Sequence, residues 1–198
     1  MSKIQHSEDP VSILNDWLKE AHEHPDVNEP TAMSLATSSK DGKPSLRVVL
    51  AKEVNQRGIV FYTNLASQKG REIDDNNNVA LCFYWMALNK QVRIIGKAYQ
   101  IDDEEADQYF AARSRGSQLS AWASKQSVTM SKEDELDKRI EKIEGDFKNI
   151  NIPRPPFWSG LRVVPESFEF WRAKDFRRND RTLYSRVANG WVISKLYP

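Results

Sequence analysis

Residues 32–54, AMSLATSSKDGKPSLRVVLAKEV, give the clearest indication of the fold class of this chain. From residue 32 the spacing of apolar side chains has a period of two, which is typical of a strand with one buried face. Residues 40–43, Lys-Asp-Gly-Lys, form a turn sequence between two such runs, residues 32–39 and 44–54. The stretch therefore predicts a hairpin of two antiparallel strands.

The same pattern continues along the chain. Residues 55–58 predict a second turn, and Asn189-Gly190 predicts a tight hairpin turn near the end. Further strands are expected at residues 59–64, 79–85, 91–101, 157–164, 167–171, 182–187 and 191–196. Short antiparallel strands joined by tight turns favour a small barrel, a mainly β (α+β) fold with peripheral helices, over βαβ units.

Four helices are expected around this sheet. Their N-terminal signals are Asp9 followed by Pro10, Ser67, the acidic run 102–105, and Ser131 with Asp134 as a capping box. The last helix has a narrow apolar stripe, so we expect it to lie on the barrel surface. The stripe consists of Leu136, Ile140, Ile143 and Phe147. No repeat or boundary divides the 198 residues, so we expect one domain, residues 1–198, with residues 1–8 flexible.

Composition excludes several classes of protein. The 29 basic and 28 acidic residues nearly cancel, which argues against a polyanion binder held by charge alone. The single Cys82 excludes a disulfide scaffold, and the three histidines (His6, His22 and His24) lie too near the start for a catalytic triad or a metal site in the body of the domain. The glycines are at least twelve positions apart, so no Rossmann or Walker loop can be formed.

The sequence also predicts where the protein works. The first ten residues contain no apolar run, so they do not predict a secretory signal. No stretch approaches the roughly 20 apolar residues that cross a bilayer. We therefore expect a cytoplasmic protein with no membrane partner.

The densest basic segment is residues 172–186. It holds six arginines and lysines against Asp175 and Asp180, a local charge of +4. The planar guanidinium group of arginine forms bidentate hydrogen bonds with phosphate or carboxylate groups. A nucleic-acid-binding strip and a solvated charged face are the alternatives for this segment taken alone.

A second group of polar donors surrounds Arg47 and Lys52. Five positions separate the two residues, so on one regular strand they point to opposite faces and cannot bind one anion together unless the strand is bulged. The helix after Ser67 could hold a phosphate at its N-terminus, where Lys69 adds charge.

A third group contains Tyr109 and Arg113, four residues apart on one helix face, with Ser117 in the turn that follows. A buried core aromatic is the alternative for Tyr109. Three donor-rich clusters without a metal-ligand set or a histidine base suggest a site for one or two phosphorylated aromatic molecules.

Six segments resemble, in order and spacing, the motifs of the pyridoxine/pyridoxamine 5′-phosphate oxidase family: RVVLAK, FYTN, QVRIIGKA, YFAARSRGSQ, AWASKQS and FEFW…RRNDR. The resemblance implies a split β-barrel homodimer with FMN at each subunit interface. It implies flavin contacts at Arg47, Lys52, Tyr62, Thr63, Gln68, Lys69, Gln91, Gln126, Ser127, Trp171 and Arg181. It implies contacts to the substrate phosphate at Lys52, Tyr109, Arg113 and Ser117, and catalytic positions at Arg177 and Asn179.

The implied reaction oxidises pyridoxine or pyridoxamine 5′-phosphate to pyridoxal 5′-phosphate, with O2 as acceptor and H2O2 released. This chain departs from the family pattern at three places. Asn179 stands where the family motif Arg-Leu-His-Asp-Arg has histidine, and Gln68 stands where an arginine is expected. We also expect the N-terminal extension, which covers the substrate in many members of the family, to be absent or very short. The alternatives are a phenazine-pathway type of FMN oxidase and a flavin- or pyridoxal-phosphate-binding protein with little turnover.

Overall fold

The computed structural model describes residues 9–131 and 135–198. The expected flexible segment 1–8 and the Asp134 part of the expected capping box lie outside the described residues. The strands are β1 (Ala32–Ser38), β2 (Pro44–Leu50), β3 (Glu53–Asn55), β4 (Gly58–Asn64), β5 (Asn78–Trp85), β6 (Lys90–Gln100), β7 (Trp158–Arg172), β8 (Asp180–Val187) and β9 (Gly190–Lys195). The helices are α1 (Pro10–Glu23), α2 (Gln68–Asp75), α3 (Asp103–Ala111), α4 (Arg115–Ala123) and α5 (Leu136–Asp146).

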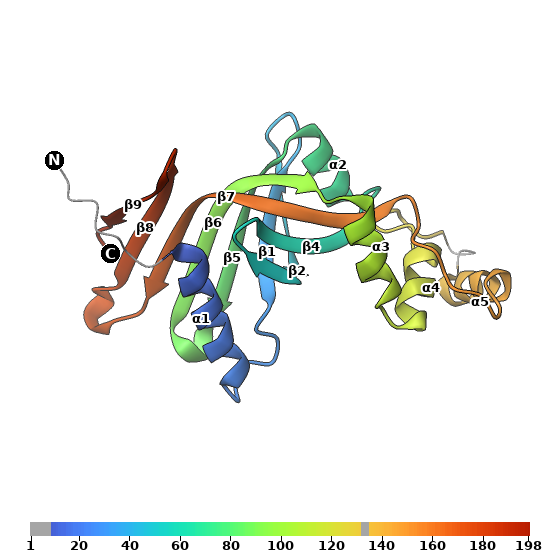
Figure 1. Cartoon of the computed structure of the whole chain (residues 1–198), viewed down its shortest axis with the longest axis horizontal. Helices are drawn as coiled ribbons and strands as arrows, with labels where there is room; N and C mark the ends of the chain where they lie inside the picture. Colours follow the sequence, from blue (N-terminus) through green and yellow to red (C-terminus); the bar gives the residue numbers. More distant parts are fainter. Residues whose placement is uncertain (1–8, 132–134) are drawn as a thin grey trace.

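The described strands form one sheet in which every pairing is antiparallel. The order is β2-β1-β5-β6-β7-β4-β3, and β8 and β9 continue outward from β7. Figure 1 shows the sheet curled into part of a barrel, with the β8–β9 hairpin at one end and α3, α4 and α5 at the other. The predicted mainly β fold with antiparallel strands is confirmed.

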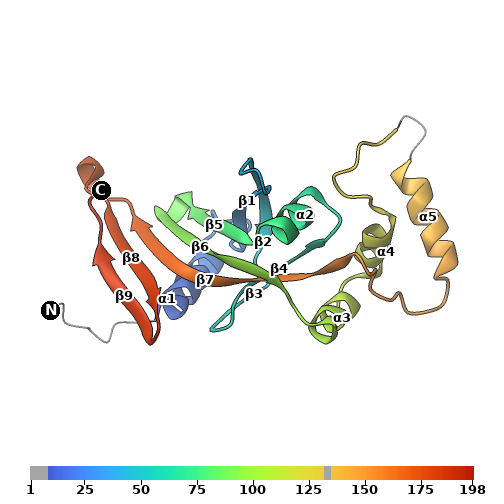
Figure 2. The same cartoon turned by 90° about the horizontal axis from the view of Figure 1, so that it is seen from above.

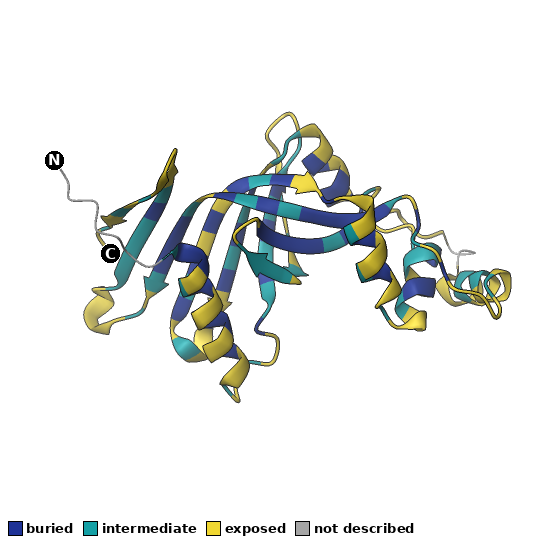
Figure 3. Cartoon of the chain, in the orientation of Figure 1, coloured by how far each residue is buried: buried dark blue, intermediate teal, exposed yellow. Residues whose placement is uncertain are grey.

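Helix α1 closes the inner side of the curled sheet. The Asp9 carboxylate accepts a hydrogen bond from the Ser12 N–H at 3.1 Å and Pro10 begins the helix, as the sequence predicts. The apolar side of the helix is buried, and its Trp17 ring meets the Phe170 ring of β7 edge-on at 5.2 Å. Figure 3 shows this burial on the side of α1 that faces the sheet, while the other side is exposed.

The strand expected at residues 44–54 is two strands. Strand β2 pairs with β1 up to Leu50, and β3 pairs with β4 from Glu53. Between them the Ala51 N–H donates to Thr31 O, whereas the Lys52 N–H donates to Val60 O. The chain thus changes pairing partner at this point, which interrupts the regular alternation of faces.

The two strands expected at residues 157–164 and 167–171 are one strand, β7. Ile95 pairs with Ser167 and Gly96 with Pro165, so one extra residue on β7 forms a bulge. A bulge accommodates the missing N–H of proline inside a sheet. A Cβ on Gly96 would lie 2.3 Å from Val164 O, so only glycine allows this close approach of the two backbones.

The helical end differs most from the sequence prediction. Helix α4 covers residues for which the sequence predicted a turn, so Ser117 lies in a helix. The prediction that α5 lies on the barrel surface is wrong, because α5 packs chiefly against α4, at the end of the molecule in Figure 2. Its apolar stripe packs there beside Leu119, and the Phe147 ring lies 5.4 Å from that of Trp122. No helix in residues 9–131 or 135–198 has both the length and the apolar character needed to cross a bilayer.

Candidate functional site

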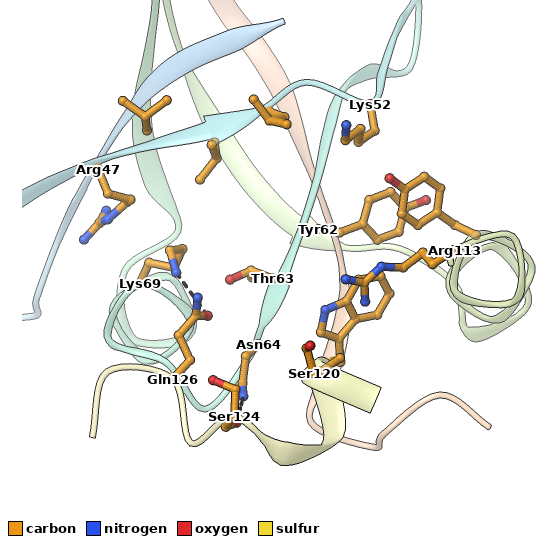
Figure 4. A pocket seen from close by; sticks show the side chains of 16 residues that line it. Arg47, Lys52, Tyr62, Thr63, Asn64, Lys69, Arg113, Ser120, Ser124 and Gln126 are labelled. Carbon is orange, nitrogen blue, oxygen red and sulfur yellow. Dashed lines mark hydrogen bonds between the residues drawn. The ribbon is translucent and has the colours of Figure 1, made fainter. Parts of the chain in front are cut away.

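A pocket of about 590 Å³ lies between the end of β2, strand β4 and helices α2 to α4. Half of the expected site residues line it: Arg47, Lys52, Tyr62, Thr63, Lys69, Tyr109, Arg113 and Gln126. Figure 4 shows Lys69 and Gln126 together on one side and Tyr62 and Arg113 on the other, with Thr63 between them. The pocket thus has two cationic ends separated by the side chains of β4.

Arg47 and Lys52 both line this pocket although they stand five positions apart. The prediction that they point to opposite faces assumes one continuous strand. That assumption is wrong because β2 ends at Leu50 and Lys52 lies in the crossing to β3.

The Arg47 guanidinium is fixed by hydrogen bonds to one backbone oxygen and three polar side chains. Its Nη1 donates to Leu35 O at 3.2 Å and to Thr37 Oγ1, and its Nη2 donates to Ser45 Oγ and, at 3.3 Å, to Glu72 Oε2. Burial raises the pKa of Glu72, but hydrogen bonds from Ser45, Thr37 and Gln68 and the charge of Arg47 outweigh it, and the pKa falls to about 2. Arg47 is therefore oriented before any ligand binds.

Glu72→Gln should lower the free energy of unfolding by about 1–2 kcal/mol at pH 7, because hydrogen bonds to a charged partner are the stronger ones. The pKa of this carboxyl is about 2 in the folded chain and 4.5 without the fold. Its contribution is complete above the higher value and is lost as the pH falls through the lower one. The difference in Tm between wild type and variant should therefore shrink between pH 5 and pH 2.

Glu23→Gln is the matched control for this experiment, because Glu23 forms only an exposed pair with Lys19 at 4.0 Å. Its Tm should match that of wild type at every pH, since exposed pairs contribute little. A difference for Glu72→Gln that stays constant down to pH 2 would contradict the role of the charge.

Lys69 supplies the second cation of this end. Its Nζ lies 3.3 Å from Ser67 Oγ and 3.4 Å from Gln126 Oε1, and among the described residues it has no ion pair. Burial and the charge of Arg47 lower its pKa, against the opposing effect of Glu72. A buried cation beside the N-terminus of α2 favours an anionic ligand.

Two residues shape the N-terminus of α2 beside Lys69: Ser67, which caps the helix, and Gly70, which lies in its first turn. Ser67 Oγ accepts the Gly70 N–H at 3.4 Å, as the predicted N-cap requires. A Cβ on Gly70 would lie 2.1 Å from Leu65 O, so the turn before the helix requires glycine. Gln68 does not line the pocket, because its Nε2 donates to Glu72 Oε1 at 2.8 Å. Ser127, also outside the lining, has a left-handed φ of 69° directly after Gln126.

The other end of the pocket is aromatic and carries Arg113. The Tyr62 and Tyr109 rings stack at 3.7 Å, and the Trp158 ring lies nearly parallel to Tyr62 at 5.2 Å. Burial, followed by the charge of Glu105, raises the pKa of Tyr62 to about 12, and burial also raises that of Tyr109. Both phenols therefore stay neutral hydrogen-bond donors at physiological pH.

Ser117 does not line the pocket. It lies in the first turn of α4, where its Oγ accepts a hydrogen bond from Ser114 Oγ at 2.8 Å. The sequence did not single out Asn64, Ser124 or Trp158, which do line the pocket. Asn64 lies in the motif FYTN and Ser124 in the motif AWASKQS, so their places in these motifs could have identified them as pocket residues.

A second group of expected residues lies outside this pocket. Gln91, Trp171 and Arg181 occupy paired positions on β6, β7 and β8, so they form one row across the sheet. Strand β8 stands at the opposite end of the sheet from α3 to α5 (Figure 1). Arg181 Nε donates to Glu169 Oε1 at 2.8 Å, and its Nη1 donates to Tyr197 O at 2.9 Å.

Arg177 and Asn179 lie on the loop before β8, also outside the pocket. Asn179 Oδ1 accepts the Lys174 N–H at 3.2 Å and so closes the loop. Phe176 and Arg177 both have left-handed backbones, with φ of 55° and 60°. Such strain in residues other than glycine tends to occur at functional sites.

Two protein-family models match this chain. The family model described as pyridoxamine 5′-phosphate oxidase matches residues 18–145, and the model of the pyridoxine 5′-phosphate oxidase C-terminal dimerisation region matches residues 158–198. The dimerisation region fits the expected dimer.

Individual relatives match over nearly the whole chain. A pyridoxine/pyridoxamine 5′-phosphate oxidase of Rubrobacter xylanophilus is 48% identical over 96% of this chain and 87% of its own length. One from Rhodospirillum rubrum is 44% identical over 100% of both chains. The crystal structure of PhzG from Burkholderia lata 383, in complex with tetrahydrophenazine-1-carboxylic acid, has a TM-score of 0.91 at 31% identity and covers 98% of this chain and 95% of that one. The expected split-barrel fold is thereby confirmed, and the chain belongs to the pyridoxamine 5′-phosphate oxidase family.

Proposed function

We propose that this chain is an FMN-dependent oxidase that converts pyridoxine or pyridoxamine 5′-phosphate to pyridoxal 5′-phosphate, with O2 as acceptor and H2O2 as by-product. With the amine substrate, one water molecule is consumed and ammonia is released. The observation that carries this proposal is the single pocket with two cationic ends, Arg47 with Lys69 and, apart from them, Arg113. Two phosphorylated aromatic molecules, a flavin and its substrate, require two such ends. The relatives that match nearly the whole chain are named for this activity.

The end formed by Arg47, Lys69 and Gln126 fits the phosphate of FMN. Lys69 is a buried cation beside a helix N-terminus and has no ion pair among the described residues, so it favours an anion, and Arg47, oriented by Glu72, lines the same end. Lys52, Tyr62 and Thr63 would line the rest of the flavin site, with Gln68 and Ser127 beside its phosphate end. FMN, when bound, supplies the acceptor for the hydride that leaves the substrate.

The aromatic end fits the substrate phosphate. Arg113 lines this end with a buried Nη1 that has no hydrogen-bond partner among the described residues, and the neutral Tyr109 phenol is a donor in the same part of the pocket. Lys52 also lines the pocket, on the same side as Tyr62 in Figure 4, and could contact a ligand there, and Ser117 would contribute after its hydroxyl rotates away from Ser114. The work of these residues is to bind and orient the substrate, which makes the reaction effectively unimolecular.

A second copy of the chain would complete the site. The sheet face that carries Gln91, Trp171 and Arg181 also carries exposed apolar side chains. The cross-strand pairing shows that they lie on the same side of the sheet as this row. These are Leu46 (69% exposed), Val48 (64%), Tyr84 (57%) and Ile95 (47%). Val48 also lines the pocket, so a copy docked on this face would adjoin it. We propose that the row and the loop with Arg177 and Asn179 reach the pocket of the other copy.

The direct test is purification followed by assay. We expect a yellow dimer with about one FMN per chain that releases one H2O2 per pyridoxal 5′-phosphate formed from either substrate. Flavin absorbance, light scattering and a coupled peroxide assay measure these properties. Colourless protein that cannot be reconstituted with FMN would refute the proposal.

A second candidate function is oxidation of a different reduced aromatic compound. Asn179 in place of the family histidine and the likeness to PhzG in complex with tetrahydrophenazine-1-carboxylic acid favour it. Yellow protein that turns over neither vitamin B6 phosphate would support this alternative.

Asn179→His separates the two functions. If the asparagine only weakens contacts at the reacting end of a vitamin B6 oxidase, the variant should raise kcat on pyridoxine 5′-phosphate by about 100-fold, the lower end of what one positioned acid–base group contributes. Asn179→Asp is the control, because it keeps an acceptor for the Lys174 N–H but adds no cation, and it should show no gain. Activity near zero in both variants would favour the second function.

A further inference from the structure

Arg113 is held differently from Arg47, the other arginine that lines the pocket. Arg47 is paired with Glu72, and Arg162, which lies outside the lining, is paired with Glu53 at 2.8 Å and Glu105 at 2.5 Å. Arg113 forms no ion pair within residues 9–131 and 135–198, and its buried Nη1 has no hydrogen-bond partner there. Burial lowers its pKa, whereas Tyr109 raises it. A buried cation with a free donor is costly, so other contacts must hold it.

The Trp158 ring provides that contact. Arg113 Cζ lies 4.7 Å from its ring centroid and 5.6 Å from that of Phe110. Trp158 is itself buried and fixed, because Tyr62 and Tyr109 lie nearly parallel to it and the Phe110 ring meets it edge-on at 5.1 Å. A guanidinium group attracted to an aromatic face keeps its N–H groups available, since the ring uses none of them as a strong acceptor.

We infer that Trp158 is a positioning residue that holds the Arg113 guanidinium at the wall of the pocket and leaves its N–H groups available for the phosphate of the substrate. A carboxylate in this place would also hold the arginine, but it would neutralise the charge and occupy the donors that the phosphate needs. This inference rests on the proposed function for the identity of the substrate. The cation–aromatic contact itself is independent of that identity.

The test uses the FMN-loaded protein with Trp158→Phe and Trp158→Leu. The KM for pyridoxine 5′-phosphate should rise about 3-fold for phenylalanine and about 10-fold or more for leucine, following the decrease in cation–aromatic attraction. The kcat and the FMN content should stay within about 2-fold, because Trp158 acts on binding of the phosphate. The dissociation constant of inorganic phosphate, measured by calorimetry on the same samples, should follow the KM.

A double-mutant cycle with Arg113→Ala distinguishes positioning from packing. If Trp158 acts through Arg113, Trp158→Phe should not raise KM further when Arg113 is already alanine. The same increase in both backgrounds would overturn the inference. Phenylalanine keeps an aromatic ring in the cluster, so the cycle can be measured even if the leucine variant does not fold.

Trp191→Phe is the matched control, because Arg186 Cζ also lies 4.7 Å from the Trp191 ring but outside the pocket. Its KM and phosphate affinity should equal those of wild type. If wild type oxidises neither vitamin B6 phosphate, the proposed function fails, and phosphate affinity alone decides the inference. Unchanged affinity in both Trp158 variants would then overturn it.

Discussion

Arg47→Ala should both destabilise the fold and weaken FMN binding. The substitution leaves the Glu72 carboxylate buried without its arginine, and breaking such a pair costs about 3–5 kcal/mol in general. We expect about 2–3 kcal/mol here, because Thr37, Ser45 and Gln68 still donate to the carboxylate. Loss of a charge-assisted contact to the flavin phosphate should raise the Kd of FMN about 10- to 100-fold. Urea unfolding and fluorescence titration of the apoprotein measure the two effects.

Arg47→Ala combined with Glu72→Gln separates these effects. Removing the buried charge should restore most of the lost stability, because no ion is then left without its partner. FMN affinity should stay low, since the cation that faces the phosphate is still absent. Recovery of FMN affinity in the double variant would show that Arg47 acts only through the stability of the fold.

Arg113→Ala should lower kcat/KM for pyridoxine 5′-phosphate about 10- to 100-fold, mainly through KM, while FMN stays bound. Hydrogen bonds to charged groups contribute about 1.5–3 kcal/mol each, and Arg113 has no other partner for its buried Nη1 in the described chain. Steady-state kinetics with the flavin content measured for each sample provide the check.

Two controls show whether the effect concerns the phosphate. Activity on unphosphorylated pyridoxine should change little, because that substrate has no group for Arg113 to bind. Arg115→Ala replaces a nearby exposed arginine that donates to the backbone oxygens of Phe147 and Ile150, and its kinetics should resemble wild type. Loss of FMN from Arg113→Ala would instead assign this residue to the flavin.

Local patterns in the sequence predicted most elements of the fold. The hairpin of residues 32–50, the Asp9 cap of α1 and the Asn189-Gly190 turn depend on neighbouring residues alone. Alternation along a strand shows which side chains share a face, and turn residues show where the chain reverses. Antiparallel pairing of consecutive strands follows from these two properties.

The elements that the sequence mispredicted depend on distant partners. Pro165 interrupts the alternating pattern of β7. The strand nevertheless continues, because β7 forms a bulge where it pairs with Gly96 of β6. Lys52 leaves its strand because its N–H pairs with Val60 rather than with β1. The apolar stripe of α5 predicts that the helix packs against another element, but the local sequence does not indicate that this element is α4.

The amino-acid sequence was enough to predict the antiparallel β architecture, the family resemblance and the residue types available for binding two phosphates. The three-dimensional arrangement was needed to show which of those residues meet in one pocket and which, such as Arg181 on β8, lie at the far end of the sheet. It also supplied Glu72 and Trp158, which orient the two arginines of the pocket and carry no motif of their own. The physical reason is that strand pattern is local, whereas a site depends on contacts between side chains far apart in the chain.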